Sequence, residues 1–453
     1  MEETNAFELR CGDEPLLTFL FREDALGTVS AHILGIDEGN RHLMPWGLGD
    51  GDDGLYGWLE RRALPHNRKN AAKIARALGF APGDLEAAYS VTMGLSLNDS
   101  YWTPAAGSTS SFADVNLYEN PFSEALFSVA FAGVGEGWPG LTPEFTTDGT
   151  LKKAWRIGED GVRELCKGAS NGWFPGEPAS EVLASLVAEE AGIDAVRYSL
   201  EADDEGEFVS VCPCFCTRDV SYAPFASATG LTDMTGVIAF AASHGRDELE
   251  RVCDMIVFDS LIANSDRHFA NFGLMRNSGT GDFLRFAPIF DNGRGLLPML
   301  GDDRLDDASF ELATLTSALG GLEFAEQARR VIGSRQLEWC EALAGGGVER
   351  AMERAAAAHP ALSSRADAMT RIIGERAVGL ARTAAVDHGV LGARALEAMR
   401  CRIEAGDHTM RASFGDVALR EVEESGEEPD VKAMMKPPSP LHFTREPQQR
   451  HGR

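Results

Sequence analysis

Three side chains in the segment 258–297 have the types and the order that a phosphoryl-transfer site needs. Asp266 is followed five positions later by Asn271, and Asp291 stands two positions before Gly293. Phosphoryl transfer requires a carboxylate that accepts or orients the proton of the attacking hydroxyl. It also requires oxygen ligands for the metal ions that neutralise a triphosphate, and a carboxamide with a second carboxylate supplies them. The segment therefore predicts Asp266 as the acceptor, with Asn271 and Asp291 as Mg²⁺ ligands.

The spacing of these residues is typical of protein kinases. Kinases place the catalytic Asp and a metal-binding Asn five residues apart, and a second metal-binding Asp follows in a D-x-G. The segment 266–293 has the same spacing and order. Each motif alone is common, because an Asp–Asn pair at this spacing arises by chance and D-x-G is usually a turn. The order of the motifs and their context favour the kinase interpretation.

A kinase-type site also needs a cation on an upstream strand, and Lys167 is the candidate. Glu181 opens the next predicted helix and shares a face with Ala184, Ser185 and Ala188. Because this face carries small side chains, it can pack close to a strand and bring Glu181 to Lys167. The alternatives are a surface lysine and a first-turn glutamate that complements the helix dipole.

A turn rich in hydroxyl groups, over residues 146–150, precedes the lysine in F-T-T-D-G-T-L-K-K. It does not match the P-loop pattern G-x-x-x-x-G-K-[ST]. Its backbone N–H groups, together with Lys152 and Lys153, could nevertheless contact phosphates.

Three other side chains near the Asp–Asn–Asp set each have two interpretations. His268 is either a base or a brace for the loop, and the second is favoured because Asp266 already fills the acceptor role. Arg267 and Arg294 either contact phosphate or pair with neighbouring carboxylates.

The lysine and the glutamate lie in a strand-rich stretch over 138–216. One helix is expected at 180–191, because Pro178 precedes it and Gly192 follows it. The strands expected in this stretch cover 151–157, 162–167, 196–200 and 208–215.

The rest of the chain divides into a mixed part and a helical part. Small strands are expected over 7–48, and a helical pattern starts at Leu55. From about Thr232 nearly everything reads as helical up to Val386, and again over 393–405. The proline-rich C-terminal stretch predicts a disordered tail.

The composition is that of a globular and strongly acidic chain. The 453 residues include 42 Lys and Arg against 70 Asp and Glu, so the formal net charge is −28. This charge argues against binding along nucleic acid by charge alone, and it requires cations to be gathered at any phosphate site. The first residues are acidic where a signal peptide would be basic, and no apolar run is long enough to span a membrane. A cytoplasmic protein is expected.

The cysteines do not indicate a disulfide scaffold, because eight are too few for a chain of this length. Cys212, Cys214 and Cys216 alternate, so on a strand they would share one face. They form either a metal or redox cluster or a row of small buried side chains, and their spacing favours the second.

One basic cluster follows the first helical pattern. It consists of Arg61, Arg62, Arg68, Lys69 and Lys73. A solvated helix face is the favoured interpretation, and a partner-binding patch is the alternative.

Taken together, these motifs show that the chain resembles the HipA-like serine/threonine kinases. The resemblance rests on N-S-D-R-H-F-A-N-F-G with A-P-I-F-D-N-G-R-G-L-L, on T-T-D-G-T-L-K-K-A-W ahead of E-L-C-K-G, and on E-P-A-S-E-V-L-A-S-L-V-A. It covers residues 90–300 by motif and the helical remainder by the order of elements.

The resemblance implies an α+β, two-lobed protein-kinase-like fold with a strand-rich small lobe and a helical large lobe, after a mixed N-terminal extension. The implied boundaries are 1–135 for the N-terminal region, 136–216 for the small lobe, 217–432 for the large lobe and 433–453 for the tail.

The resemblance also implies roles for individual residues. Asp266 would be the catalytic acid/base, Asn271 and Asp291 the Mg²⁺ ligands, and Lys167 the ATP lysine with Glu181 as its partner. The other ATP contacts would be Thr147 and Gly149 in the phosphate loop, Lys153 after it, and Cys214 in a hinge over 211–215. Autophosphorylation of a loop serine can inactivate kinases of this family. The matching stretch here holds Thr146 and Thr147 instead, so this regulation stays open.

The implied function is ATP- and Mg²⁺-dependent phosphoryl transfer to Ser or Thr of a protein substrate, in the manner of a toxin of a toxin–antitoxin pair. The alternative is a regulatory scaffold with little catalysis, which would bind DNA through a partner such as a small helix-turn-helix antitoxin. A third interpretation changes the acceptor to a lipid or small-molecule hydroxyl. It ranks last, because the sequence has no basic amphipathic helix for a membrane surface.

Overall fold

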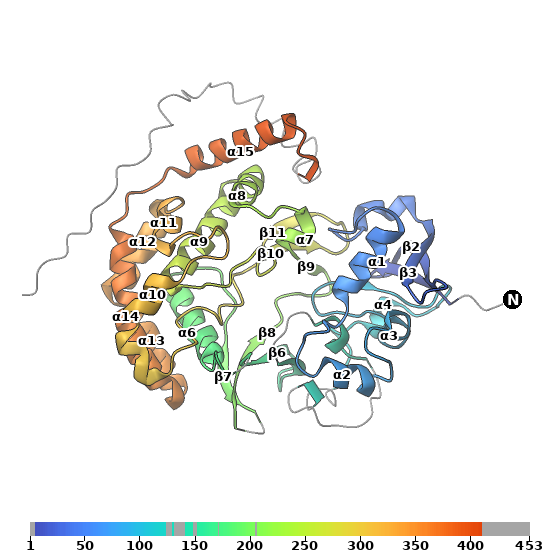
Figure 1. Ribbon diagram of the computed structural model, residues 1–453, viewed down its shortest axis with the longest axis horizontal. Coiled ribbons are helices and arrows are strands. Elements are labelled where there is room, and N and C mark those ends of the chain that lie inside the picture. The colour runs from blue at the N-terminus through green and yellow to red at the C-terminus, as the bar shows by residue number, and fades with distance from the viewer. Residues whose placement is uncertain are drawn as a thin grey trace, which may run out of the picture. The chain divides into compact units, whose positions relative to one another are not determined.

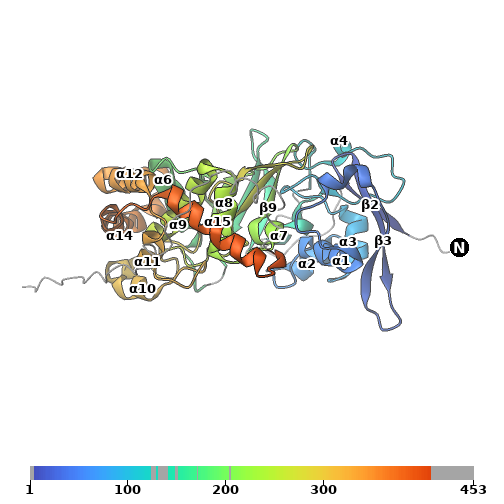
Figure 2. The same cartoon turned by 90° about the horizontal axis from the view of Figure 1, so that it is seen from above.

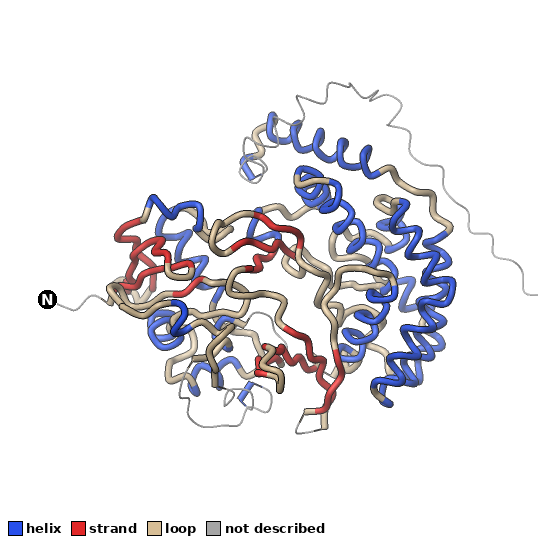
Figure 3. The backbone as a smooth tube through the Cα atoms, turned by 180° about the vertical axis from the view of Figure 1, so that it is seen from behind, coloured by secondary structure: helices blue, strands red, loops and turns tan. Residues whose placement is uncertain are grey.

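The computed structural model describes residues 5–123, 129–130, 141–147, 152–170, 172–203 and 206–409, all within one compact unit. The predicted C-terminal tail lies outside the described residues. The fold is mixed, with three antiparallel sheets and many helices. The long helices gather at one side of this unit and the N-terminal sheet lies at the other (Figures 1 and 3). In the described part of the chain, no helix combines the length and the apolar character that crossing a membrane requires.

The N-terminal part is a sheet covered by helices on one face, as Figure 2 shows. Its strands pair in the order β3-β2-β1-β4, and helices α1 to α3 supply the other half of its core. The elements are β1 (Ala6–Cys11), β2 (Glu14–Glu23), β3 (Val29–Ile36), α1 (Gly51–Arg62), α2 (Ala71–Ala77), α3 (Leu85–Thr92), β4 (Tyr101–Trp102) and α4 (Phe112–Val115). Phe7, Phe19 and Phe21 pack together on the inner face, with 5.5 to 5.6 Å between their ring centroids. The small strands and the following helix predicted here are confirmed.

The basic cluster is not a single solvated face, so that interpretation is wrong for two of its members. Arg68 is buried, pairs with Glu144 at 2.8 Å, and donates to the carbonyls of Glu144, Thr147 and Lys153. Arg62 pairs with buried Asp99. A guanidinium has five N–H donors and can therefore hold several backbone carbonyls at once, which the charge pattern along the sequence does not reveal.

The central sheet has the order β5-β6-β8-β7, and helix α6 packs against it. Its elements are β5 (Lys153–Ile157), β6 (Arg163–Gly168), α6 (Glu177–Glu190), β7 (Ser199–Ala202) and β8 (Phe208–Pro213). The predicted strands and helix are confirmed here, with shifts at their ends. The strand expected from Val196 begins only at Ser199, because the N–H of Val196 donates to Ile289 O outside this sheet.

A third sheet corrects the expectation that the chain is helical from about Thr232. Strands β9 (Val220–Pro224), β10 (Gly273–Asn277) and β11 (Phe283–Phe286) pair in the order β11-β10-β9. Phe225 stacks on Phe272 and Phe286, at 5.2 and 5.9 Å between ring centroids. These strands are held by contacts that are distant in sequence, so the local pattern did not distinguish them from the helices on either side.

The remaining helices include α9, which is buried along most of its length and packs against α8, α11, α12, α14 and α15. They are α7 (Phe225–Thr229), α8 (Met234–Ser243), α9 (Arg246–Ile262), α10 (Ser309–Thr314), α11 (Phe324–Arg329), α12 (Ser334–Ala342), α13 (Val348–Ala358), α14 (Ser363–Ala381) and α15 (His388–Glu404). Short 3₁₀ or π turns are η1 (Glu38–Leu43), η2 (Glu144–Thr146), η3 (Asp302–Asp307), η4 (Leu343–Gly347) and η5 (Pro360–Leu362). Because α9 is buried, the loop that follows it starts from a rigid support.

Replacing the buried arginine Arg68 by methionine tests its contribution to stability. Arg68→Met leaves Glu144 buried without its partner, and such losses cost about 3–5 kcal/mol. The expected result is a free energy of unfolding lowered by about that amount in urea titrations followed by tryptophan fluorescence. Lys69→Met is the matched control, since Lys69 is exposed, and its change should stay within about 0.5 kcal/mol. Equal midpoints for the two variants would contradict the prediction.

Candidate active site

A buried ion-pair cluster joins three of the residues that the sequence singled out. Lys167 Nζ lies 3.1 Å from Glu181 Oε1 and 2.9 Å from Asp291 Oδ1. The Lys167 side chain is 7% exposed and that of Asp291 is 33% exposed. The structure thus brings together a lysine of β6, a glutamate of α6 and an aspartate that is distant from both in sequence.

Helix α6 approaches the sheet closely because its inner face is small. Ala184, Ser185 and Ala188 are buried on the face that also carries Glu181. Ser185 accepts a hydrogen bond from the N–H of Tyr198 at 3.2 Å, which ties the helix to the segment leading into β7. Short side chains here leave room for the longer Glu181 to reach Lys167.

The cluster is charged. Burial opposes the charge of Lys167, but Asp291 and Glu181 outweigh it and hold the pKa of the lysine well above its usual range. Burial likewise opposes ionisation of Asp291, but Lys167 and Lys153 hold the pKa of that carboxyl below its usual range. Both Lys167 and Asp291 are therefore ionised at neutral pH, and each is the other's main counter-charge.

Asp291 lies in a turn with an unusual backbone. Its φ of 58° is in the left-handed region, which costs a non-glycine residue about 1–2 kcal/mol. The next residue is held on two sides: Asn292 N–H donates to Glu181 Oε2 at 2.7 Å, and Asn292 Oδ1 accepts from Arg267 at 2.6 Å. These two bonds compensate the strain and direct the Asp291 carboxylate toward Lys167.

Arg267 connects helix α9 to both loops of the site. Its guanidinium is buried and donates to the Asp259 carboxylate at 3.0 and 3.2 Å. It also donates to the carbonyls of Asn271, at 2.8 Å, and of Phe290. The sequence left Arg267 open between a phosphate and an ion pair, and the structure pairs it with a carboxylate. Asp259 and Asn292 were missed, although a lone carboxylate inside the apolar run F-D-S-L-I was a signal for a buried partner.

Asp266 and Asn271 lie on the loop between α9 and β10. Asp266 is exposed, and partial enclosure with a contribution from nearby Asp291 raises the pKa of its carboxyl above the ordinary value. Asn271 Nδ2 donates to Asp266 O at 2.8 Å, which fixes the side-chain amide. Within the described residues, Asn271 Oδ1 accepts no hydrogen bond, so it is available to a cation. His268 is exposed and its Nδ1 accepts from Ala270 N–H, which agrees with a bracing role in the loop.

The lysines after the phosphate-loop turn differ in position. Lys153 lies directly opposite Lys167 in the β5–β6 ladder, so both side chains leave the same face of the sheet. Lys152 leaves the other face, and its Nζ lies 3.8 Å from Asp203 Oδ2. The cations that the acidic chain gathers near Asp291 are therefore Lys153 and Lys167.

The threonines before these lysines are buried. Thr146 Oγ1 donates to Leu95 O at 2.7 Å, and Thr147 Oγ1 donates to Pro143 O at 2.8 Å. In this arrangement neither hydroxyl is directed to a phosphate or open to modification. Gly149, the other residue predicted for the loop, lies outside the described residues.

The cysteines do not share a strand face. Strand β8 ends at Pro213, so only Cys212 belongs to it. Cys214 follows the strand, and its Sγ donates to Leu97 O at 3.2 Å. No group of three His, Cys, Asp or Glu side chains suited to a metal ion occurs in the part of the chain that the structure describes. The predicted hinge contacts the site through Phe215, whose ring packs 5.4 Å from that of Phe290.

Arg294 forms an ion pair at the edge of the site. Its Nε lies 2.6 Å from Glu177 Oε1, and its guanidinium stacks 3.5 Å from the ring centroid of Phe174. Glu177 and Phe174 precede Glu181 on the same helix and the turn before it. The ion pair is one of the two alternatives that the sequence left open for Arg294, but the identity of its partner depends on how α6 meets the turn after Asp291.

The residues present fit a nucleotide with its metal. Mg²⁺ bound with a nucleotide commonly takes one or two protein oxygens and completes its shell with phosphate and water. Asn271 Oδ1 and the Asp291 carboxylate are two such oxygens, and Lys153 and Lys167 supply positive charge on the adjacent sheet face. The chemistry of this donor set suits phosphate oxygens and a hard cation.

Comparison with known proteins finds a kinase among the proteins that are similar to this chain. No family model matches the chain. The serine/threonine-protein kinase CtkA of Helicobacter pylori is 29% identical over 149 residues, which are 29% of this chain and 43% of CtkA, so the match spans less than half of that relative. The crystal structure of CtkA has a TM-score of 0.43 and 18% identity, with 56% of this chain and 93% of CtkA covered.

A solved structure that contains HipA aligns with most of this chain. The Shewanella oneidensis MR-1 toxin–antitoxin structure of HipA, HipB and operator DNA aligns over 85% of this chain and 99% of that chain, with 12% identity and a TM-score of 0.50. At this identity the match shows the fold alone. The chain therefore has a fold similar to that of HipA, and part of its sequence is similar to the serine/threonine-protein kinase CtkA.

Proposed function

We propose that the protein is an ATP- and Mg²⁺-dependent kinase that phosphorylates Ser or Thr of a protein substrate. The observation that carries this proposal is the buried Lys167, ion-paired to Glu181 and to Asp291 at once. Asp291 is partly exposed, and it is close enough to the loop of Asp266 and Asn271 to contribute to the raised pKa of Asp266. The arrangement combines a phosphate cation, its orienting glutamate and a metal ligand.

In this proposal Asp266 acts on the acceptor hydroxyl. Its raised pKa makes the carboxylate a better proton acceptor than an ordinary exposed aspartate. It is also exposed, so the hydroxyl of a folded protein substrate can reach it. Asn271 and Asp291 hold Mg²⁺, which neutralises phosphate charge when it is bound.

Lys167 and Asp291 exchange partners in the proposed cycle. In the present arrangement they neutralise each other at 2.9 Å. With nucleotide and its cation bound, Lys167 would hold phosphate oxygens and Asp291 would hold the cation, while Glu181 would keep its contact with the lysine. Lys167 and Asp291 would each exchange one partner of opposite charge for another, so neither charge would be left unpaired in the buried site.

The proposal includes a two-lobed arrangement with the boundaries 1–135, 136–216 and 217–432, and a tail over 433–453. Substrate and nucleotide would meet between the sheet that carries Lys167 and the loop that carries Asp266. Thr147 and Cys214 would contact the nucleotide only after a rearrangement of their segments, and Gly149 remains a proposed contact. The hydroxyl of Thr147 and the thiol of Cys214 now donate to backbone carbonyls.

A toxin role with a small helix-turn-helix partner is part of the proposal by analogy with HipA, whose structure contains HipB and operator DNA. The scaffold alternative loses support from the basic cluster, because Arg62 and Arg68 are used inside the fold. The net charge of −28 also gives no reason to expect direct contact with nucleic acid.

Removal of the catalytic carboxylate tests the reaction. In Asp266→Asn we expect the phosphorylation rate, measured with radiolabelled ATP on lysate proteins or on the enzyme itself, to fall by about 10²–10⁴-fold. Affinity for Mg-ATP should stay within about threefold, since Asp266 does not hold the nucleotide. Asp303→Asn, an exposed aspartate on η3, is the control and should retain activity. Full activity of the Asp266 variant would exclude this assignment.

The metal ligand can be tested without catalysis. Wild type should gain thermal stability from ATP with Mg²⁺ and gain less from ATP alone. In Asp291→Asn the Mg²⁺-dependent part of the Tm shift should disappear, because a neutral amide replaces the anionic ligand. Asp303→Asn should behave as wild type. A variant that keeps the full Mg²⁺-dependent shift would show that the metal binds elsewhere.

A further inference from the structure

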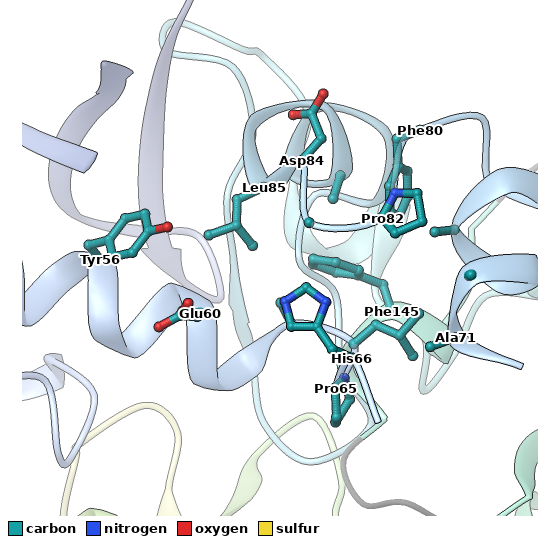
Figure 4. A pocket seen from close by; sticks show the side chains of 16 residues that line it. Tyr56, Glu60, Pro65, His66, Ala71, Phe80, Pro82, Asp84, Leu85 and Phe145 are labelled. Atoms are coloured by element: carbon teal, nitrogen blue, oxygen red, sulfur yellow. The ribbon is translucent and has the colours of Figure 1, made fainter. Parts of the chain in front are cut away.

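A pocket in the N-terminal part has no role in the proposed reaction. It has a volume of about 140 Å³ and lies among α1, α2, α3 and the turn at Phe145 (Figure 4). Its wall is mostly apolar: Phe80 and Leu85 are buried beside it, and Phe145 lies at its centre in the view. The pocket exists because alanines face it where larger residues would fill it. They are Ala63, Ala71, Ala72, Ala75 and Ala88.

Polar groups lie around this apolar wall, and two of them are carboxylates. Tyr56 and Glu60 come from α1, His66 from the turn after it, and Asp84 from the start of α3. Asp84 Oδ1 accepts from Ala87 N–H at 3.0 Å and has further acceptor capacity. Among the described residues, no cation lies within ion-pair distance of Glu60 or Asp84. Glu60 is close enough to Tyr56 to contribute to the raised pKa of its hydroxyl, after burial.

These features select a ligand by size and charge. A cavity of about 150 Å³ with apolar walls holds one benzene ring. Two carboxylates at the rim favour a cation and disfavour an anion, and the faces of Phe80 and Phe145 favour a cation or an aromatic ring. An inorganic ion would leave the apolar wall uncovered, and a neutral hydrocarbon would make no use of the Glu60 carboxylate.

We propose that this pocket binds a small organic cation, namely a protonated amine attached to one compact ring. The ring covers Phe145 and the alanines, and the ammonium group lies on the side of Glu60. The proposal goes beyond the proposed kinase function and does not depend on it.

The pocket touches the chain that leads to the phosphate-loop turn. Phe145, which forms part of its wall, stands between Glu144 and Thr146. Arg68 joins Glu144 and Thr147 to the carbonyl of Lys153, whose side chain lies on the same sheet face as Lys167. A ligand against Phe145 therefore contacts a segment that is hydrogen-bonded to the strand next to the candidate active site.

Benzylamine is the probe, and titration calorimetry of the full chain is the measurement. The assay is run at about pH 8. We expect one saturable site with a Kd of about 1 mM or below. Benzyl alcohol has the same shape without the charge and should bind about tenfold more weakly. n-Butylamine carries the charge without the ring and should also bind more weakly.

Variants locate the site. Glu60→Gln keeps the shape and removes the charge, and it should weaken benzylamine binding about tenfold. Glu86→Gln is the matched control, because Glu86 is on α3 but does not line the pocket, and it should bind as wild type. Ala71→Phe fills the pocket and should abolish binding while the thermal melt shows that the protein is folded.

Four outcomes would overturn the proposal. They are no saturable binding of benzylamine, equal binding of benzyl alcohol, unchanged binding in Glu60→Gln, and tighter binding of n-butylamine. The last would indicate a lysine side chain of another protein as the occupant. None of these outcomes depends on kinase activity, so the failure of this proposal and that of the proposed function are distinguishable.

Discussion

The guanidinium of Arg267 is the interaction on which the candidate site depends. It is buried, and its donors reach the carboxylate of Asp259 on helix α9, the carbonyls of Asn271 and Phe290, and the side chain of Asn292. One group thereby fixes the loop that carries Asp266 and the turn that carries Asp291 to the same buried helix. Without Arg267, Asp259 would be a buried and unpaired charge, and neither loop would keep its position.

A second set of contacts positions the sheet against that turn. Glu181 accepts from Lys167 with one oxygen and from Asn292 N–H with the other. The α6 helix therefore holds the lysine of β6 and the turn of Asp291 through a single carboxylate. The strained backbone at Asp291 persists because Asn292 is bonded from both directions. The site is thus built by hydrogen bonds between elements, and α6, with its small inner face, is the part that lets them meet.

The acidity of the chain and the chemistry of the site are compatible. The net charge of −28 is distributed over a surface that repels anions, while Lys153 and Lys167 leave one face of the central sheet. Asp291 is the counter-charge of Lys167, and Lys153 also helps to keep its carboxyl ionised. Other basic side chains form contacts within the fold. Arg68 holds backbone carbonyls in the N-terminal part, and Arg294 pairs with Glu177 beside the site.

The sequence by itself determined which residue types stand at Lys167, Glu181, Asp266, Asn271 and Asp291, and in which order, because spacing along a strand, helix or loop is local information. It also predicted the strands and the helix that carry the first two. Only the tertiary structure decided that Arg267 binds Asp259, that Arg68 is buried, and that the segments at β10 and β11 are strands. The pocket beside Phe145 also became visible only there. These features depend on groups brought together from distant parts of the chain, and burial rather than residue type decides whether such a group is a solvated charge, a structural tie or part of a site.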